Sequence, residues 1–239
     1  MRLRLFLDAQ KTVSQEHFHK GYFTAMHGFL ANIAGKDEKY GKYCFGNLFP
    51  IRNQLIEQGK TYEVLIGSPV PSIIEKLFFA LPREKTLNIG ELQFTLSNIE
   101  VQKRILTRNS TIESISPVNI TIHENGRIRF LRYGEGQYVS YLKKHLLKKY
   151  HFLTGKNAEI DLFNNVTIAE HEKHPFVCYQ INFFNKQSNK TFSVCGSKLV
   201  FRFKDISDEQ LSIFQTLFDT GFGERTTYGA GFMIERWER

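Results

Sequence analysis

Residues 221–231 read GFGERTTYGAG, so four glycines surround one arginine and two threonines. Glycine tolerates positive φ angles and close backbone contacts that other residues avoid. A helical pattern ends at Gly221 and an apolar strand pattern follows at 232–237. The dinucleotide-binding GxGxxG motif follows a strand and opens a helix, so this context excludes it. Exposed N–H groups in such a loop, together with Arg225, are suited to hold phosphate oxygens. A simple flexible connection is the alternative.

The segment before this loop predicts the second half of the fold. Ser207 and Gln210 form a capping-box pair ahead of apolar residues at helical spacing, which marks a helix that stops at Gly221. Further upstream, polar residues 107–114 (TRNSTIES) read as a linker. Between the linker and this last helix we expect strands at 118–122 and 128–131, a helix at 136–152, and a hairpin of strands 176–184 and 192–203.

The first half shows the same order of elements more clearly. Leu3, Leu5 and Leu7 alternate with polar or aromatic neighbours, as in a half-buried strand. The remaining patterns predict a helix at 16–34, a loop at 35–42, strands at 43–49 and 62–66, a helix at 72–81 and a β region at 86–105. This order is βαββαβ. We therefore predict an α+β protein of two tandem ferredoxin-like (RRM-like) domains, 1–109 and 110–239, the second carrying the C-terminal Gly-rich loop.

The composition favours a polyanionic partner. The 239 residues include 32 Lys and Arg against 24 Asp and Glu, a net charge of +8, and basic proteins attract nucleic acids. The start of the chain is too short and too alternating for a signal peptide, and no long apolar run is present, so we expect a cytoplasmic protein without a membrane partner. Three cysteines without CxxC spacing predict neither a disulfide framework nor a zinc knuckle.

The order of helix, GxG, five residues including a basic one, GxG and terminal strand resembles the signature of the RAMP superfamily of CRISPR-associated RNA-binding proteins. Within it, the chain looks most like the Cas-six type of endoribonuclease, which processes CRISPR repeat RNA into guide RNAs. Residues 25–30 (AMHGFL) are similar to the His-Gly stretch in which many members place a catalytic histidine. The layout matches over the whole chain, whereas specific matches are confined to the loop and the first helix.

This resemblance implies metal-independent RNA cleavage, without a cofactor, by attack of a 2′-hydroxyl on the adjacent phosphorus. The products are a 2′,3′-cyclic phosphate and a 5′-hydroxyl. Histidine suits such proton transfers because its pKa of about 6.5 keeps both forms available. His27 is the preferred catalytic candidate, and a partly buried packing histidine is the alternative. Several members carry a second histidine in the loop after the first helix; here that loop has none, and Tyr40 and Lys42 are the substitutes.

The expected partner is CRISPR repeat RNA, while other effector subunits and a homodimer stay open. A non-catalytic RNA-binding RAMP subunit of an effector complex is the alternative function, and a housekeeping RNA-binding protein is a third. Basic clusters can follow a phosphate backbone, although a solvated helix face explains surface lysines equally well. The predicted RNA-binding residues are Arg225, Thr226, Gly221, Gly223, Gly229, Gly231, Lys143, Lys144 and Arg129.

Overall fold

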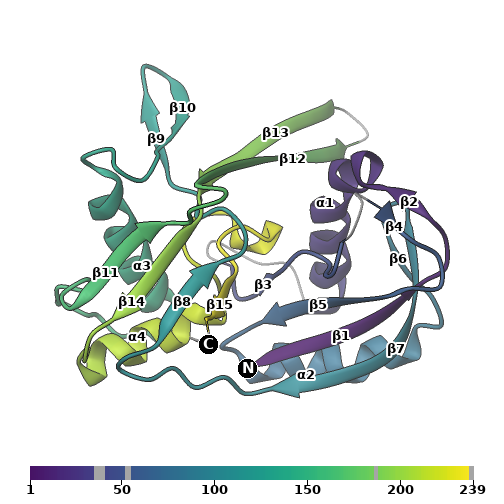
Figure 1. Cartoon of the computed structure of the whole chain (residues 1–239), viewed down its shortest axis with the longest axis horizontal. Helices are drawn as coiled ribbons and strands as arrows, with labels where there is room; N and C mark the ends of the chain where they lie inside the picture. The colour runs from purple at the N-terminus through teal and green to yellow at the C-terminus, as the bar shows by residue number, and fades with distance from the viewer. Residues whose placement is uncertain (35–40, 52–54, 186–187, 237–239) are drawn as a thin grey trace.

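The computed structural model describes residues 1–34, 41–51, 55–185 and 188–236, without the side chains of 15–20 and 180–192. The chain forms two halves, each with a main sheet and two helices, and a long hairpin extends from the second half to the first (Figure 1). Among the described residues no helix is both long and apolar enough to cross a membrane.

The first half is built on a five-stranded antiparallel sheet in the order β3-β5-β1-β7-β6. Its central strand buries Leu3, Leu5 and Leu7 against both helices, which present Met26, Leu30 and Leu77 to them. The alternation of the first residues therefore corresponds to a strand with one core face. The elements are β1 (Arg2–Ala9), β2 (Val13–Ser14), α1 (Gln15–Ala34), β3 (Cys44–Phe45), β4 (Leu55–Ile56), β5 (Thr61–Gly67), α2 (Pro71–Ala80), η1 (Leu81–Arg83), β6 (Leu87–Ile89) and β7 (Leu92–Gln102).

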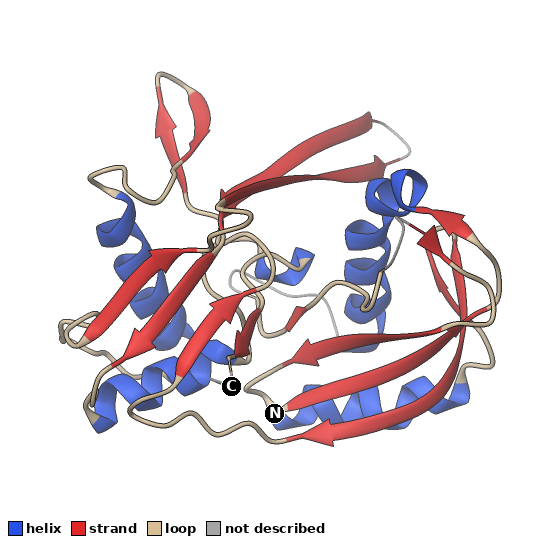
Figure 2. Cartoon of the chain, viewed as in Figure 1, coloured by secondary structure: helices blue, strands red, loops and turns tan. Residues whose placement is uncertain are grey.

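The second half has a four-stranded sheet in the order β11-β14-β8-β15, covered by α3 and α4 (Figure 2). The predicted capping box is present, because the Ser207 hydroxyl accepts from Gln210 N–H and the Gln210 side chain accepts from Ser207 N–H. The elements are β8 (Thr111–Ser114), β9 (Thr121–Glu124), β10 (Arg127–Phe130), α3 (Tyr138–Thr154), β11 (Val166–Glu170), β12 (Phe176–Asn185), β13 (Ser188–Ser197), β14 (Leu199–Phe203), α4 (Asp208–Phe218), η2 (Thr226–Tyr228) and β15 (Met233–Glu235).

Three sequence expectations differ from this arrangement. The predicted linker 107–114 contains β8, which pairs with both β14 and β15; only Ile112 among its residues is apolar, so composition hides a strand. The two strands expected near 118–131 form the separate hairpin β9–β10. The last hairpin strand also ends early: Ser197 closes β13, and β14 then joins the main sheet beside β11, which the sequence did not predict.

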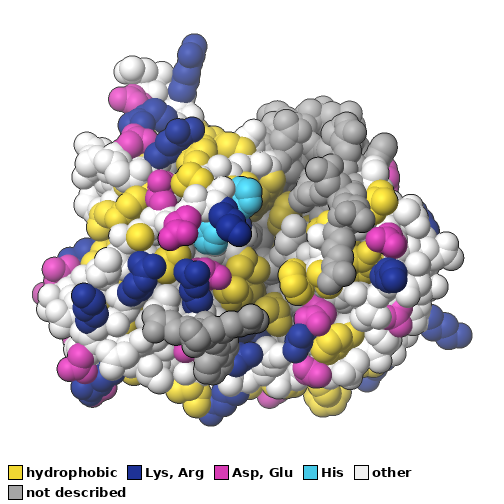
Figure 3. Space-filling model, viewed as in Figure 1, with side chains coloured by type: hydrophobic (Ala, Val, Ile, Leu, Met, Phe, Trp, Pro, Cys, Tyr) yellow, Lys and Arg dark blue, Asp and Glu magenta, His cyan; other side chains and the backbone are white. Residues whose placement is uncertain are grey.

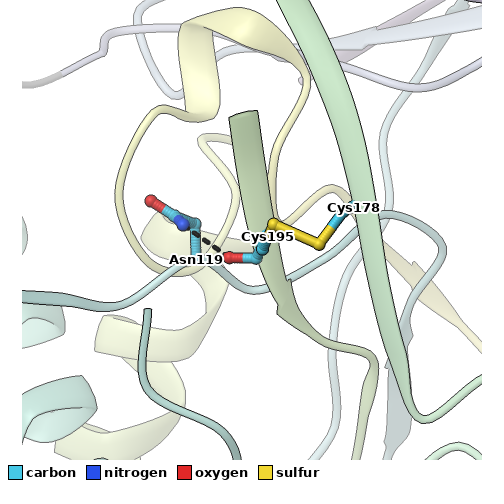
Figure 4. The surroundings of a disulfide bond; sticks show 3 residues. All are labelled: Asn119, Cys178 and Cys195. Atoms are coloured by element: carbon cyan, nitrogen blue, oxygen red, sulfur yellow. Dashed lines mark hydrogen bonds between the residues drawn. A yellow bond between two sulfur atoms is a disulfide. The ribbon is translucent and has the colours of Figure 1, made fainter. Parts of the chain in front are cut away.

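One disulfide joins the two strands of the β12–β13 hairpin, contrary to the expectation from cysteine spacing. Cys178 and Cys195 are directly opposite in the register, with Cα atoms 4.1 Å apart. Asn119 lies beside the bond and donates from Nδ2 to the Cys195 carbonyl at 2.6 Å (Figure 4). The backbone carbonyl of Asn119 accepts a hydrogen bond from the Glu224 N–H at 2.8 Å. Asn119 therefore links this hairpin to the glycine-rich segment.

A buried ion pair joins the two halves. The Arg2 side chain, only 2 % exposed, donates from Nε to Asp219 Oδ1 at 3.1 Å and from Nη2 to the Phe218 carbonyl at 2.6 Å. Its guanidinium also lies 3.7 Å from the centre of the Phe218 ring. The alternation of β1 thus faces Arg2 away from its own core and toward the end of α4 in the second half. This contact helps to fix the relative placement of the two halves.

Candidate active site

His27 lies on α1, on the border of the stripe that packs against the first sheet. Met26 and Leu30 are fully buried, whereas His27 is half-buried and Gly28 is exposed. One residue along a helix corresponds to a rotation of about 100°, which turns His27 away from the centre of the core. The helix therefore presents an imidazole at the edge of the first half.

Residues of two other segments contact this ring. The Thr227 carbonyl oxygen, on η2 of the second half, is 2.9 Å from His27 Nδ1. The Tyr43 hydroxyl, just before β3, is 3.0 Å from the same nitrogen. The Tyr228 ring packs against the imidazole at a tilt of 37°, with 4.1 Å between ring centres. His27 is therefore held at the junction of the two halves by groups that are distant in sequence.

The glycine-rich segment has an internal reason for its glycines. All four are buried and have φ between +63° and +79°. A Cβ at Gly231 would lie 1.8 Å from the Phe222 carbonyl oxygen, and one at Gly223 would lie 2.6 Å from that of Asn119. The N–H groups of Gly229 and Gly231 donate to Thr226 and Pro117 within the protein. These two donors thus differ from the exposed groups that the sequence suggested, and RNA contact by Gly221, Gly223, Gly229 and Gly231 stays a prediction.

A buried lysine forms hydrogen bonds to the glycine-rich segment. Lys149, on α3, is 1 % exposed. Its Nζ donates to the carbonyls of Thr220 and Gly221 at 2.8 and 3.0 Å and to Thr226 Oγ1 at 2.8 Å. An ammonium group has three N–H donors, so these three acceptors match it. Lys149 is thus part of the packing that holds the loop, and its position in a lysine-rich helix gave no sign of its burial.

Arg225 precedes η2 in the left-handed region, at φ +56°. Its side chain is half-buried, and its charge lowers the pKa of Tyr228, although burial has the larger effect and raises that pKa above the ordinary value. The Tyr228 phenol therefore stays protonated near neutrality. The arginine brings positive charge to the same turn that contacts His27.

The C-terminal part of the chain matches a known protein family. The family described as "CRISPR associated protein Cas6, C-terminal" matches residues 98–235, more than half of the chain. The chain belongs to the Cas6 family.

Three known proteins resemble the chain over nearly its whole length. A protein of Methanocaldococcus jannaschii named CRISPR-associated endoribonuclease Cas6 2 is 23% identical over 249 residues, covering 98% of each chain. A solved structure described as a Cas6-related gene from Pyrococcus furiosus superposes with a TM-score of 0.74 at 15% identity, covering 100% of this chain and 99% of the other. A structure described as a RAMP protein binding different RNA substrates gives a TM-score of 0.71 at 16% identity, with 99% and 100% coverage. The two structural matches show that the chain has the fold of these proteins.

The other site residues expected of a Cas6-family chain lie in several places. Tyr40 is outside the described residues, and the backbone carbonyl of Lys42 accepts from Ser68 Oγ at 2.7 Å. Lys143 and Lys144 lie on α3, where Lys143 pairs with Asp161 at 2.9 Å and Lys144 is exposed. Arg129 on β10 pairs with Glu124 and Glu135. The roles of these residues stay predictions.

A separate pocket of about 910 Å³ opens between the two halves. Its walls include Phe49, Leu65 and Ile234, with the polar side chains of His174 and Lys198. Figure 3 shows histidine and Lys or Arg side chains together near the middle of one face of the molecule. Burial lowers the pKa of Lys198, and Glu113 partly offsets this. The pocket shares no lining residue with the described surroundings of His27.

The sequence did not identify the residues that contact His27. Tyr43, Thr227 and Tyr228 were not among the predicted site residues. Thr227 and Tyr228 belong to the quoted loop, but their approach to α1 depends on how the two halves dock. Tyr43 lies three positions after the predicted Tyr40, and it is 1 % exposed. Its adjacency to a strand gave no sign that its hydroxyl faces a histidine.

The partial burial of His145, on α3 near Lys149, leads us to expect that the stability of the fold depends on pH. Burial, and then the charges of Lys149 and Lys148, lower its pKa to about 3. The folded state therefore binds fewer protons than the unfolded state, and stability is lost as pH falls below about 6.5. Because the ring is partly exposed, we expect a loss of about 1–2 kcal/mol between about pH 7 and pH 5. Urea unfolding of the native protein and of His145→Gln checks this: the variant is expected to show a flatter profile, and equal slopes would contradict the assignment.

Proposed function

We propose that this Cas6-family protein is an endoribonuclease that binds CRISPR repeat RNA and cuts it without a metal ion, with His27 as the group that transfers protons. The observation that carries the proposal is the placement of His27 at the junction of the halves, oriented by Thr227, Tyr43 and Tyr228. The name of the Methanocaldococcus jannaschii relative, a CRISPR-associated endoribonuclease, supports the reaction class.

The reaction balances without an outside reagent. The 2′-hydroxyl loses its proton to a base while its oxygen forms a bond to the adjacent phosphorus. The bond from phosphorus to the 5′-oxygen breaks, and that oxygen takes a proton. The products are a 2′,3′-cyclic phosphate and a 5′-hydroxyl. His27 acts as general acid or base, since imidazole can hold or release a proton near neutrality. Positive charge near the phosphorane stabilises the transition state, and Arg225 and Lys42 are the candidates for this role. Tyr40 carries no positive charge and is the candidate for orienting the 2′-hydroxyl through a hydrogen bond.

The fold supports this division of labour. In each half the main strands and helices follow a βαββαβ order, as β1-α1-β3-β5-α2-β7 and β8-α3-β11-β14-α4-β15. We infer that the halves are tandem ferredoxin-like domains with the boundary at 109/110, between β7 and β8. The first domain supplies His27, and the second supplies the turn that contacts it. An active site at this junction depends on the docking of both domains.

RNA affinity is expected to depend on the exposed basic face of α3. Reversing Lys143 and Lys144 to glutamate removes two cations that contact phosphates in the proposal. We expect binding to weaken about tenfold at low salt, and the slope of log affinity against log salt to fall by about one per lysine. The control variant Lys76→Glu/Lys85→Glu makes the same charge change at two exposed positions, one on α2 and one shortly after it. We expect it to leave the salt dependence of RNA affinity nearly unchanged. Identical slopes for the two double variants would reject the RNA-binding role of α3.

The experiment that tests the proposed function uses the full chain and a candidate repeat RNA in excess EDTA. Product ends are then mapped chemically. We expect cutting at one position, with a cyclic phosphate on the upstream fragment and a 5′-hydroxyl on the downstream one. Tight binding without cutting would overturn the proposal in favour of a non-catalytic RNA-binding subunit. Products with a 5′-phosphate would overturn the 2′-hydroxyl route.

A further inference from the structure

The contact between His27 and Thr227 determines which ring nitrogen carries the hydrogen. Thr227 offers a carbonyl oxygen, which can only accept a hydrogen bond, at 2.9 Å from Nδ1. Nδ1 therefore carries the hydrogen and donates it. The Tyr43 hydroxyl is compatible with this state, because it can accept from the same N–H at 3.0 Å or donate to the His27 carbonyl at 3.5 Å. In the neutral ring the lone pair then lies on Nε2.

Tyr228 determines the plane of the ring. Its aromatic ring lies 4.1 Å from the imidazole centre to centre, with 37° between the planes. Rotation of the imidazole about χ2 would bring ring atoms into this face. The residue that follows the carbonyl acceptor thus limits the second degree of freedom of the histidine. Two consecutive residues of η2 act on one side chain of α1.

The turn that carries these groups is held on three sides. Lys149 Nζ donates to Thr226 Oγ1 beneath it, and the Tyr179 hydroxyl of β12 donates to the Tyr228 carbonyl at 3.0 Å. On the third side, a Cβ at Gly41 would lie 2.5 Å from Thr227 Cγ2, so the chain before Tyr43 passes close to the turn. A turn fixed in this way is a stable acceptor, as the orientation of a functional histidine requires.

We propose that η2, residues Thr226–Tyr228, is a positioning element for His27: the Thr227 carbonyl holds the Nδ1–H tautomer and the Tyr228 ring holds the imidazole plane, so that Nε2 is the atom that exchanges a proton with RNA. This inference rests on the proposed function for its catalytic consequence. It assigns to the glycine-rich segment a role in the chemical step, separate from any contact with phosphate. Thr227 and Tyr228 are positioning residues because they act through His27.

The tautomer is tested without RNA. Full-length protein with heavy nitrogen in its histidines is studied by heteronuclear NMR above the pH at which its histidines are protonated, and His27→Gln identifies the signals of His27. We expect a protonated Nδ1 and an unprotonated Nε2 in the native protein. A predominant Nε2–H form would overturn the inference. This readout stands even if the native protein fails to cut RNA, which would reject only the proposed function.

The ring contact is tested by a matched pair of variants. Tyr228→Leu removes the aromatic face, whereas Tyr228→Phe retains it and removes only the hydroxyl. We expect Leu to slow single-turnover cleavage about 10–100-fold, with a mixture of tautomers in the NMR spectrum and an unchanged RNA dissociation constant. Phe is expected to restore both the rate and the single tautomer. A native rate in the Leu variant, or a loss of rate explained by weaker RNA binding, would overturn the positioning role. If the Leu variant does not fold, Tyr228→Met, which fills the same space without an aromatic face, takes its place with the same expected and contradicting outcomes.

Discussion

Replacing His27 with alanine is expected to slow single-turnover cleavage of repeat RNA by about 10²–10⁴-fold, the usual contribution of a general acid or base. RNA affinity should change little, because a half-buried ring at the junction of the two halves offers little surface to a phosphate backbone. The fold should be retained, since Met26 and Leu30 beside it supply the buried contacts of α1. Quench-flow or manual time courses with enzyme in excess of RNA measure the chemical step, and a filter-binding assay measures affinity.

His151→Ala is the matched control for this variant. His151 is also a helical histidine, but it is exposed on α3 and belongs to the second half. We expect it to cut at the native rate. If His27→Ala also cuts at the native rate while binding RNA normally, His27 has no part in the reaction. A loss of rate that disappears when RNA is saturating would instead assign His27 to binding.

Gly231→Ala is expected to lower the free energy of unfolding by about 3–5 kcal/mol, among the larger effects of a single substitution. Gly231 has φ +63°, which costs alanine energy in itself. Its Cβ would also lie 1.8 Å from the carbonyl oxygen of Phe222, a backbone atom that cannot move aside like a flexible side chain. The Gly231 carbonyl accepts from the Phe222 N–H, so relief of the overlap would break this contact. Urea unfolding measures the loss.

Gly126→Ala separates the energetic cost of the left-handed backbone conformation from the cost of the steric overlap. Gly126, in the turn between β9 and β10, has φ +74°, but no atom lies within 4 Å of the Cβ that alanine would add. We expect this variant to lose only about 1–2 kcal/mol, the cost of the left-handed conformation. Equal losses in the two variants would show that close packing of the loop contributes nothing. The Gly231 variant is also expected to cut RNA slowly, because the loop that contains Gly231 also contains the turn that contacts His27.

The sequence was sufficient for the features that depend on local pattern. Alternation around Leu3 and Leu5 predicted a strand with one buried face, and a capping pair predicted the start of α4 at Ser207. Both depend on residues close together in sequence, where periodicity and capping chemistry act directly. His27 was singled out by the resemblance of residues 25–30 to the His-Gly stretch of the family; the structure places it at the edge of the helix stripe, and its catalytic role stays a prediction.

The features that the sequence did not predict depend on contacts between segments that are distant in the chain. Four glycines suggested exposed N–H groups for phosphate, but their burial follows from neighbours such as Asn119, which no local pattern identifies. Lys149 is indistinguishable from the surface lysines of α3 until its three oxygen acceptors are seen. Cys178 and Cys195 pair because the hairpin register places them opposite each other. The chemistry of His27 likewise needs Thr227, 200 positions away.

The most direct test of metal-independent cleavage by 2′-hydroxyl attack uses one altered RNA. The repeat RNA carries a single 2′-deoxy nucleotide immediately before the mapped cleavage position, and cutting by the native protein is followed in EDTA. We expect this RNA to bind as tightly as the unmodified one and to remain uncut, because its nucleophile is missing. Cleavage of the deoxy RNA at the native rate would contradict the proposed reaction.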